Sequence, residues 1–399
     1  MIKSLFSACF LFLFISFALT CQSSNDEFDN AFEFITAADM RYYVSNIDSD
    51  TRHFMGALAA IKDVGPGNFL ISTGDIDPPA DVRSAIDSIL GTDYPWYPVI
   101  GNHEIEGLEH VEFLRNYAKS KQNLPHLIRY GPPGCEGTTF SFEWENCHFV
   151  VLNQYYDGKS DMGTDGDVVP ELLEWLSQDL EENQKDFIFV LGHEPIFPMP
   201  DMETGRIRHY DNSLNKYMDN NIAFIQLLRK YQVTAYICGH SHNTSYSMFN
   251  GLWQIDTGHS RGLEGISPGV YFTDVMGGMG ENIQNGMNIA EASRAFYINH
   301  SNQKDLRKGL EYMNLSDGLG YKELNVQQAA RGLERFYTAI QLGEESRKNL
   351  EKLFWENAKY AASTFIKFYV SQKKVKAEIY RDDGRGGTYA LKKTLMLTE

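Results

Sequence analysis

Five short polar motifs in the first 242 residues contain the side chains best suited to metal chemistry. Each follows an apolar run; in chain order they are Asp39, Gly74-Asp75, Gly101-Asn102-His103-Glu104, Gly192-His193-Glu194-Pro195 and Gly239-His240-Ser241-His242. Carboxylate, amide carbonyl and imidazole groups are the ligands that hard or borderline divalent cations take in proteins. The sequence therefore predicts a metal site with six candidate ligands: Asp39, Asp75, Asn102, His193, His240 and His242.

The last of these motifs indicates more than one metal ion. His240 and His242 are two positions apart on an extended segment, so their side chains point in opposite directions. Such a pair serves two ions better than it chelates one. Two ions need a shared ligand, and the carboxylate of Asp75 could bridge them at the spacing of about 3.5–4 Å that is typical of two-metal sites.

The elements that must position these motifs alternate along the chain. Apolar runs predict strands at 32–37, 69–73, 96–100, 187–191 and 233–238, and helical spacing predicts helices at 51–63, 81–90, 108–119, 170–182 and 222–231. The segments 139–144 and 147–152 alternate like an antiparallel hairpin. The pattern predicts an α/β layered fold, with a mixed sheet and helices on both of its faces. Open α/β sheets bind ligands at the carboxyl ends of their strands, which is where the polar motifs lie.

The C-terminal part of the chain has a different pattern of predicted elements. A helical block at 325–364 precedes alternating segments at 365–370, 375–380 and 388–397, which predict strands around a glycine-rich turn. We expect a catalytic domain at 31–280, a helical insertion or lid at 281–364, and C-terminal strands at 365–399 that pack on the core.

The motifs resemble those of the calcineurin-like metallophosphoesterase superfamily, whose pattern is D-x-H, G-D, G-N-H-[DE], G-H-x-P and G-H-x-H. The purple acid phosphatase branch is the most similar, since it uses G-N-H-E. This resemblance implies a double-layered mixed β-sandwich flanked by helices, with a dinuclear metal centre. One ion would be held by Asp39, Asp75 and His242, and the other by Asp75, Asn102, His193 and His240. His103 matches the catalytic histidine of the family.

Two positions depart from the family pattern. Arg41 occupies the place of the histidine in D-x-H, so the resemblance implies a weaker first site. The planar guanidinium group of Arg41 could bind a phosphate oxygen through its N–H donors, or it could form a salt bridge with Asp39 or Glu106. Pro78 stands where the purple enzymes have a tyrosine, so we expect a protein that is not purple.

The chemistry expected of this site is hydrolysis of a phosphomonoester or phosphodiester by a metal-activated hydroxide. His103 would stabilise or protonate the leaving group, and Glu104 could orient it or cap the following helix. Sites of this composition accept Mn, Zn or Fe. Two alternatives remain: the same fold acting on a nucleotide pyrophosphate or phospholipid headgroup, and a non-catalytic surface lipoprotein that serves as a binding module.

Further candidates for substrate contact lie outside the five motifs. Arg206, Arg208, His209 and Tyr210 belong to a long loop between the fourth and fifth motifs. A basic, aromatic loop above a metal site could recognise a phosphorylated small molecule, although exposed loop charge is the simpler interpretation. His259 follows another strand and could line the pocket.

The N-terminus predicts export. Residues 1–20 read as a signal peptide, with Lys3 ahead of an apolar stretch too short for a comfortable membrane span. The segment ending at Cys21 resembles the lipobox of bacterial lipoproteins, and the polar residues up to 30 read as a tether. We therefore expect a cell-envelope lipoprotein attached through Cys21, or otherwise a periplasmic or secreted protein.

Charge and cysteine content limit the partners. The formal net charge of −17 gives no general attraction for nucleic acid. An oxidising compartment would permit a bridge between Cys135 and Cys147, but the spacing gives no disulfide framework. Cys238, inside an apolar run, is expected to be a core residue.

Overall fold

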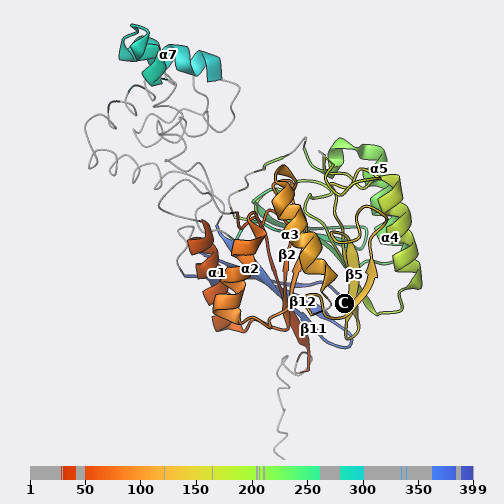
Figure 1. The fold of residues 1–399 in the computed structure, drawn as a ribbon. Coiled ribbons are helices and arrows are strands. Elements are labelled where there is room, and N and C mark those ends of the chain that lie inside the picture. Colours follow the sequence, from red (N-terminus) through yellow and green to blue (C-terminus); the bar gives the residue numbers. More distant parts are fainter. Residues whose placement is uncertain are drawn as a thin grey trace, which may run out of the picture.

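Two β-sheets pack face to face, and helices cover the outer side of each (Figure 1). The computed structural model describes residues 28, 30–41, 50–120, 122–163, 165–203, 205, 207–209, 212–260, 279–300, 334, 338, 362–382 and 388–398. The double-layered mixed fold expected from the sequence is confirmed. The signal peptide, Cys21 and most of the segment 281–364 lie outside the described residues and stay predictions.

The first sheet combines strands from the N-terminal and C-terminal parts of the sequence, in the order β13-β12-β11-β1-β2-β3. Its strands are β1 (Phe32–Ala37), β2 (Phe69–Ser72), β3 (Trp96–Pro98), β11 (Thr364–Val370), β12 (Val375–Arg381) and β13 (Ala390–Met396). β1, β2 and β3 run parallel, whereas β11 pairs antiparallel with β1. The carboxyl ends of β1 and β2 therefore lie side by side, and each is followed by a candidate ligand.

The second sheet has the order β4-β5-β6-β7-β8-β10-β9. Its strands are β4 (Leu127–Tyr130), β5 (Phe140–Trp144), β6 (Cys147–Val151), β7 (Phe187–Leu191), β8 (Ala235–Cys238), β9 (Thr244–Phe249) and β10 (Leu252–Thr257). β6, β7, β8 and β10 form its parallel centre, and β5–β6 is the predicted hairpin. The histidine motifs follow β7 and β8 directly.

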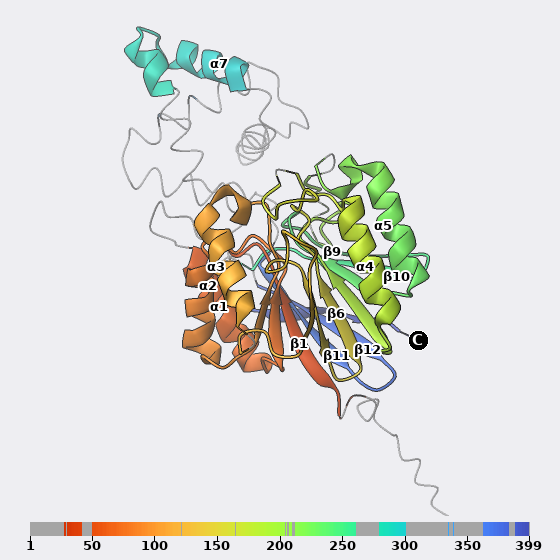
Figure 2. The same cartoon turned by 45° about the vertical axis from the view of Figure 1, so that its right-hand side comes forward.

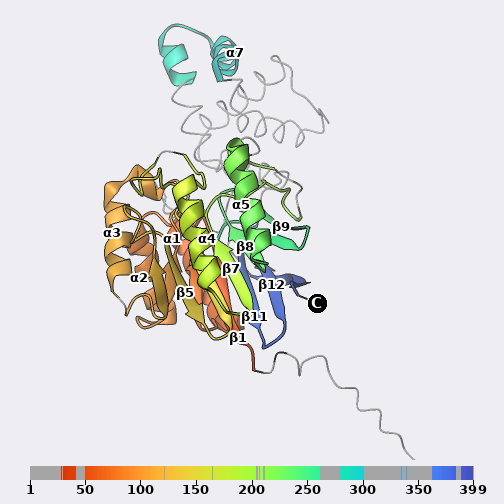
Figure 3. The same cartoon turned by 90° about the vertical axis from the view of Figure 1, so that its right-hand side faces the viewer.

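The helices lie on opposite sides of the sandwich (Figure 2). They are α1 (Asp50–Val64), α2 (Pro79–Leu90) and α3 (Leu108–Lys119) on the first sheet, and α4 (Pro170–Glu182) and α5 (Met218–Lys230) on the second. The expectation of helices on both faces of a sheet was wrong, because the inner face of each sheet is buried against the other. A further helix, α7 (Ile289–His300), lies away from the sheets in all three views (Figure 3).

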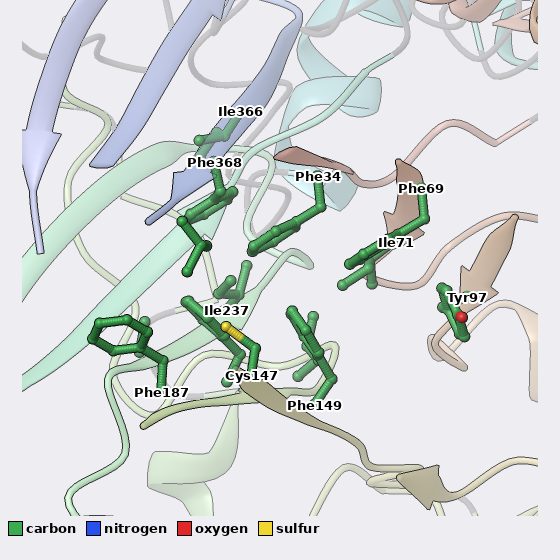
Figure 4. Close-up of a cluster of buried hydrophobic side chains, with 14 of the residues drawn as sticks. Phe34, Phe69, Ile71, Tyr97, Cys147, Phe149, Phe187, Ile237, Ile366 and Phe368 are labelled. Atoms are coloured by element: carbon green, nitrogen blue, oxygen red, sulfur yellow. The ribbon is translucent and has the colours of Figure 1, made fainter. Parts of the chain in front are cut away.

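An aromatic core fills the space between the sheets (Figure 4). Phe34 of β1 stacks on Phe368 of β11 at 4.5 Å between ring centroids, and meets Phe149 of β6 edge-on at 5.2 Å. Phe34 and Phe149 are both fully buried. Because β1 carries Asp39 at its end, the same packing that joins the layers also fixes one side of the candidate site.

Replacing Phe34 by alanine is expected to lower the free energy of unfolding by about 3–5 kcal/mol, the range for removing a buried aromatic ring. Urea unfolding followed by circular dichroism measures the change. Phe197, at 36% exposure, is the matched control, and its alanine variant is expected to lose clearly less stability than the Phe34 variant, because part of its ring is already in water. Equal effects at the two positions would contradict this description of the core.

Several details differ from the sequence-based expectations. β4 was not predicted, and α5 begins at Met218 rather than near residue 222. α7 lies within the segment 281–364, which was expected to be helical. Cys135 and Cys147 are free thiols in separate hydrophobic clusters, so the possible bridge is not formed. Cys238 is a buried core residue, as expected. Within the described residues, each helix is too short or too polar to cross a bilayer.

Candidate metal centre

The candidate ligands lie in turns that follow strands, and four of them have left-handed backbone conformations. The φ angle is 51° at Asp39, 52° at Asp75, 67° at His240 and 55° at His242. This region costs a non-glycine residue roughly 1–2 kcal/mol, and such residues concentrate at functional sites. The fold therefore holds these four residues in a backbone conformation that they would not adopt by preference.

Glycines ahead of the ligands allow the turns to approach one another. A Cβ atom added to Gly74 would lie 2.2 Å from His193 Nδ1, and one added to Gly101 would lie 2.4 Å from Asp75 Oδ1. Both distances are far inside van der Waals contact. A side chain at either position would push a candidate ligand out of the site, which explains why these two motifs begin with glycine.

Asn102, His193 and His240 lie within 3.3 Å of one another through their donor atoms, with Asp75 next to His193, and we call these four residues the four-donor set. His240 Nδ1 lies 3.1 Å from Asn102 Oδ1 and 3.2 Å from His193 Nε2. His193 Nε2 lies 3.3 Å from both Asn102 Oδ1 and Asp75 Oδ1. Ligands placed tetrahedrally at about 2.0–2.1 Å from a zinc ion are about 3.3–3.4 Å apart. These four separations are therefore those expected between neighbouring ligands of a transition-metal ion.

Backbone carbonyls orient the two imidazoles of the four-donor set. His193 Nδ1 lies 2.8 Å from Thr73 O, and His240 Nε2 lies 3.1 Å from Asn212 O. Burial lowers the pKa of both histidines, most strongly that of His240. Both rings are thus neutral, and contacts of this kind are typical of metal-ligating histidines.

Asp39, Asp75 and His242 form a second group, which we call the three-donor set. His242 Nε2 lies 3.2 Å from Asp39 Oδ1. Asp39 and Asp75 also belong, together with His193, to a cluster whose ligand atoms lie within 4.8 Å of one another. The three-donor set is therefore next to the four-donor set and shares Asp75 with it.

Arg41 lies at the edge of the three-donor set, where the family pattern has a histidine. Its Nε and Nη2 donate to the two carboxylate oxygens of Asp77 at 2.8 and 3.2 Å, and its Nη1 lies 2.6 Å from His103 Nε2. Among the described residues, its carboxylate partner is thus Asp77 rather than Asp39 or Glu106. Asp77 was not singled out from the sequence, since nothing distinguishes it from an ordinary turn residue.

His103 lies between Arg41 and the ligands. Its backbone N–H donates to Asp75 Oδ1 at 3.2 Å, and its Nε2 lies 3.7 Å from Asp75 Oδ2. Its Nδ1 lies 2.9 Å from Glu106 Oε1. At 23% exposure, the ring borders the ligands and also reaches solvent.

Glu104 has a different role from the two that the sequence suggested. Its carboxylate is fully buried and accepts hydrogen bonds from the backbone N–H groups of Gly101, Asp75 and Ile76 at 2.6, 3.0 and 2.7 Å. Burial, together with Asp75 and Asp77, raises its pKa well above the usual range. Glu104 therefore ties the turn after β2 to the turn after β3, instead of orienting His103 or capping a helix.

The charges around Asp75 oppose the effect of its burial. Burial alone would raise the pKa of this carboxyl group, but His193, His103 and Arg41 bring it below the usual value. Asp75 is thus ionised and available to a cation.

A pocket of about 380 Å³ opens beside the four-donor set. Its lining includes Asn102, Ile105, Glu106, Tyr155, Asp165, Glu194, His209, Lys216 and His240. Burial raises the pKa of Glu194 to about 7, although Tyr155 donates a hydrogen bond to it at 3.0 Å. Tyr155, Asp165 and Lys216 carried no signal in the sequence, because they come from loops without a recognisable motif.

The remaining candidates for substrate contact fall in three places. Arg208 contacts His242 Nδ1, and the ring of His209 lies 4.1 Å from that of His240. His259 is fully buried, with its ring 6.1 Å from that of His242. Arg206 and Tyr210 lie outside the described residues.

The layered fold, with aspartate and histidine ligands at strand ends, defines a metallophosphoesterase architecture. Residues 48–244 match the family model of the calcineurin-like phosphoesterases, and the chain therefore carries a domain of this family.

Curated relatives include tartrate-resistant acid phosphatase type 5 from Rattus norvegicus and Homo sapiens. They are 28% and 24% identical to this chain over 159 residues, which is 38% of the chain and 44% of each relative. The match thus spans less than half the length of these relatives. Among solved structures, PhoD has a TM-score of 0.44 at 10% identity, covering 92% of this chain and 70% of its own. GAP50, the anchor in the inner membrane complex of Plasmodium, has a TM-score of 0.43 at 13% identity, covering 91% and 90%.

Proposed function

We propose that this protein hydrolyses phosphate esters in a metal-dependent reaction. The observation that carries the proposal is the four-donor set, whose donor atoms are 3.1–3.3 Å apart and match the shell of a transition-metal ion. The family match and the similarity to acid phosphatases support phosphoester chemistry at this place. Mn, Zn and Fe are all compatible with these ligands.

A metal ion held by the four-donor set would polarise a phosphoryl oxygen and lower the pKa of a bound water. Residues around the ion would position it and bind the substrate. Asp75 and Asn102 would fix the ion relative to His103, because all three belong to turns that Glu104 ties together. Arg41 would bind a phosphate oxygen through the guanidinium edge that now faces His103.

His103 is the proposed proton carrier. In the present arrangement Arg41 donates to its Nε2, since a guanidinium has no acceptor. A phosphate oxygen that accepts this hydrogen bond instead would leave His103 Nε2 able to hold a proton. This proton, taken up from solvent, would pass to the oxygen of the leaving alcohol as its P–O bond breaks and the oxygen of a water molecule bonds to phosphorus. The attacking water would release its own proton to solvent.

The pocket favours one group of substrates over the others. Carboxyl groups of Glu106, Asp165 and Glu194 line it, with Lys216 as the basic counterpart 3.0 Å from Asp165. A leaving group that is itself a phosphate would be repelled there. Phosphomonoesters and diesters of neutral or amine-bearing alcohols are therefore the proposed substrates, ahead of nucleotide pyrophosphates.

A panel of mono-, di- and pyrophosphate esters, assayed with the metal-loaded protein, tests this proposal. Product analysis by phosphorus NMR identifies the bond that is broken. We expect turnover of mono- or diesters and little of pyrophosphates. Turnover of pyrophosphates alone would contradict the assignment of the pocket, and no turnover at all would favour the binding module.

Replacing Arg41 by alanine is expected to raise KM for a phosphate ester by about 10- to 100-fold, since a hydrogen bond to a charged group contributes about 1.5–3 kcal/mol. Metal in the four-donor set should remain bound, because Arg41 is not one of its members. Steady-state kinetics and metal analysis on the same sample measure both. Arg83, which pairs with Asp87 on α2, is the matched control. An unchanged KM in the Arg41 variant would exclude it from phosphate binding.

A further inference from the structure

The hydrogen atoms of the four-donor set point away from its centre. Thr73 O, a carbonyl oxygen, can only accept, so His193 carries its proton on Nδ1. Asn212 O places the proton of His240 on Nε2 in the same way. The two remaining ring nitrogens face each other at 3.2 Å as lone pairs, with Asn102 Oδ1 next to both. Such an arrangement favours a cation at its centre.

The three-donor set has the opposite arrangement of hydrogens. Arg208 contacts His242 Nδ1, and because a guanidinium only donates, this nitrogen is an acceptor. The proton of the His242 ring is then on Nε2, 3.2 Å from Asp39 Oδ1. The other oxygen of Asp39 accepts from the backbone N–H of His240 at 3.0 Å. Neither nitrogen of His242 then offers a lone pair to a second ion, and the backbone of His240 already donates to one oxygen of Asp39.

Fixed positive charge also lies beside the three-donor set. Arg41 has replaced an imidazole ligand by a group that cannot coordinate a cation, and its bidentate pairing with Asp77 holds it in place. Arg208 brings a second guanidinium to His242. A dication in this position would lose one ligand and face two like charges.

We infer that this chain binds a single transition-metal ion, in the four-donor set, and that Arg41 and Arg208 take the place of the second ion of a dinuclear centre. The inference rests on the proposed function, because it concerns the same site. It replaces the sequence-based expectation of a weak first site by a specific arrangement: one ion and two fixed guanidinium groups share the binding of the phosphate. Added metal would then not activate the protein beyond the first equivalent.

Metal content tests the inference without any assay of activity. The full chain is purified in detergent without chelators or a histidine tag, loaded with excess Mn(II), desalted and analysed by plasma mass spectrometry. We expect about one equivalent per chain for the parent protein, and about two for the double variant Arg41→His/Arg208→Gln, which supplies the missing imidazole and releases His242. Arg83→His, the same substitution in an arginine–aspartate pair on α2, should stay at about one.

Electron paramagnetic resonance of the Mn(II) samples gives a second readout. The parent should show the hyperfine pattern of an isolated ion, and the double variant the broad spectrum of two coupled ions. Two equivalents in the parent would overturn the inference while leaving the proposed function intact. A folded double variant with one equivalent would overturn the role of the arginines. A parent that binds no metal would overturn both the inference and the proposed function.

Discussion

Replacing His193 by alanine is expected to abolish metal binding in the four-donor set and to lower kcat/KM for phosphate esters by about 1000-fold or more. His193 Nε2 contacts three other donor atoms of the set, so its removal opens the shell on one side. A loss of about 4 kcal/mol of transition-state stabilisation, of the order that a catalytic metal supplies, corresponds to this factor.

The control for this variant is His126→Ala. His126 is an exposed loop residue outside the site, and its ring packs at a tilt against that of Trp144, with 4.7 Å between the ring centroids. Its replacement should leave metal content and turnover near those of the parent. If the His193 variant kept both its metal and its turnover, the four-donor set would not be the catalytic centre. A loss of turnover with the metal retained would point to a role for His193 other than coordination.

Replacing Glu104 by alanine is expected to have the second large effect, on stability and metal affinity together. Three buried backbone N–H groups would lose their acceptor, and each unsatisfied group costs about 1–3 kcal/mol. The free energy of unfolding should therefore fall by about 3 kcal/mol or more. The turns after β2 and β3 would also separate, and metal affinity should fall by about 10- to 100-fold, as for other residues that support ligands.

Urea unfolding and competition with a metal-binding dye measure these two effects. Glu104→Gln keeps one carbonyl acceptor and should fall between the parent and the alanine variant. Glu109→Ala, at an exposed position in the first turn of α3, should change neither quantity appreciably. Parent-like metal affinity in a folded Glu104→Ala protein would show that the hydrogen bonds to Glu104 do not hold the ligands in place.

The positions of the candidate ligands could be predicted from the sequence, whereas their contacts could not. Aspartate, asparagine and histidine residues directly after strands could be assigned to the carboxyl ends of parallel strands, where open α/β sheets bind ligands. That these residues come from two sheets could not be predicted. The contacts that decide which nitrogen binds metal could not be predicted. They come from carbonyl oxygens of Thr73 and Asn212, which carry no side-chain signal, and from distances between turns far apart in the chain. The pairing of Arg41 with Asp77 likewise depends on how two turns meet.

The fold, too, could be predicted only in part. Long periodic segments such as α3 and α4 were predicted with their observed bounds, since each has a clear apolar stripe. β4 was missed because it is a short edge strand with alternating exposure. The C-terminal strands were predicted from alternation, but their place beside β1 could not be, because strand order depends on long-range pairing. Aromatic residues such as Phe34 and Phe368 become neighbours only through that pairing.

The central claim is that a metal ion in the four-donor set is required for phosphoester hydrolysis. The most direct test removes metal from the full chain with a chelator, restores Mn, Zn or Fe stepwise, and measures bound metal and phosphate ester turnover on each sample. We predict that turnover disappears with the metal and returns in proportion to it, reaching its maximum at about one equivalent. Turnover that survives complete removal of metal, or full metal binding with no turnover of any ester, would contradict the claim.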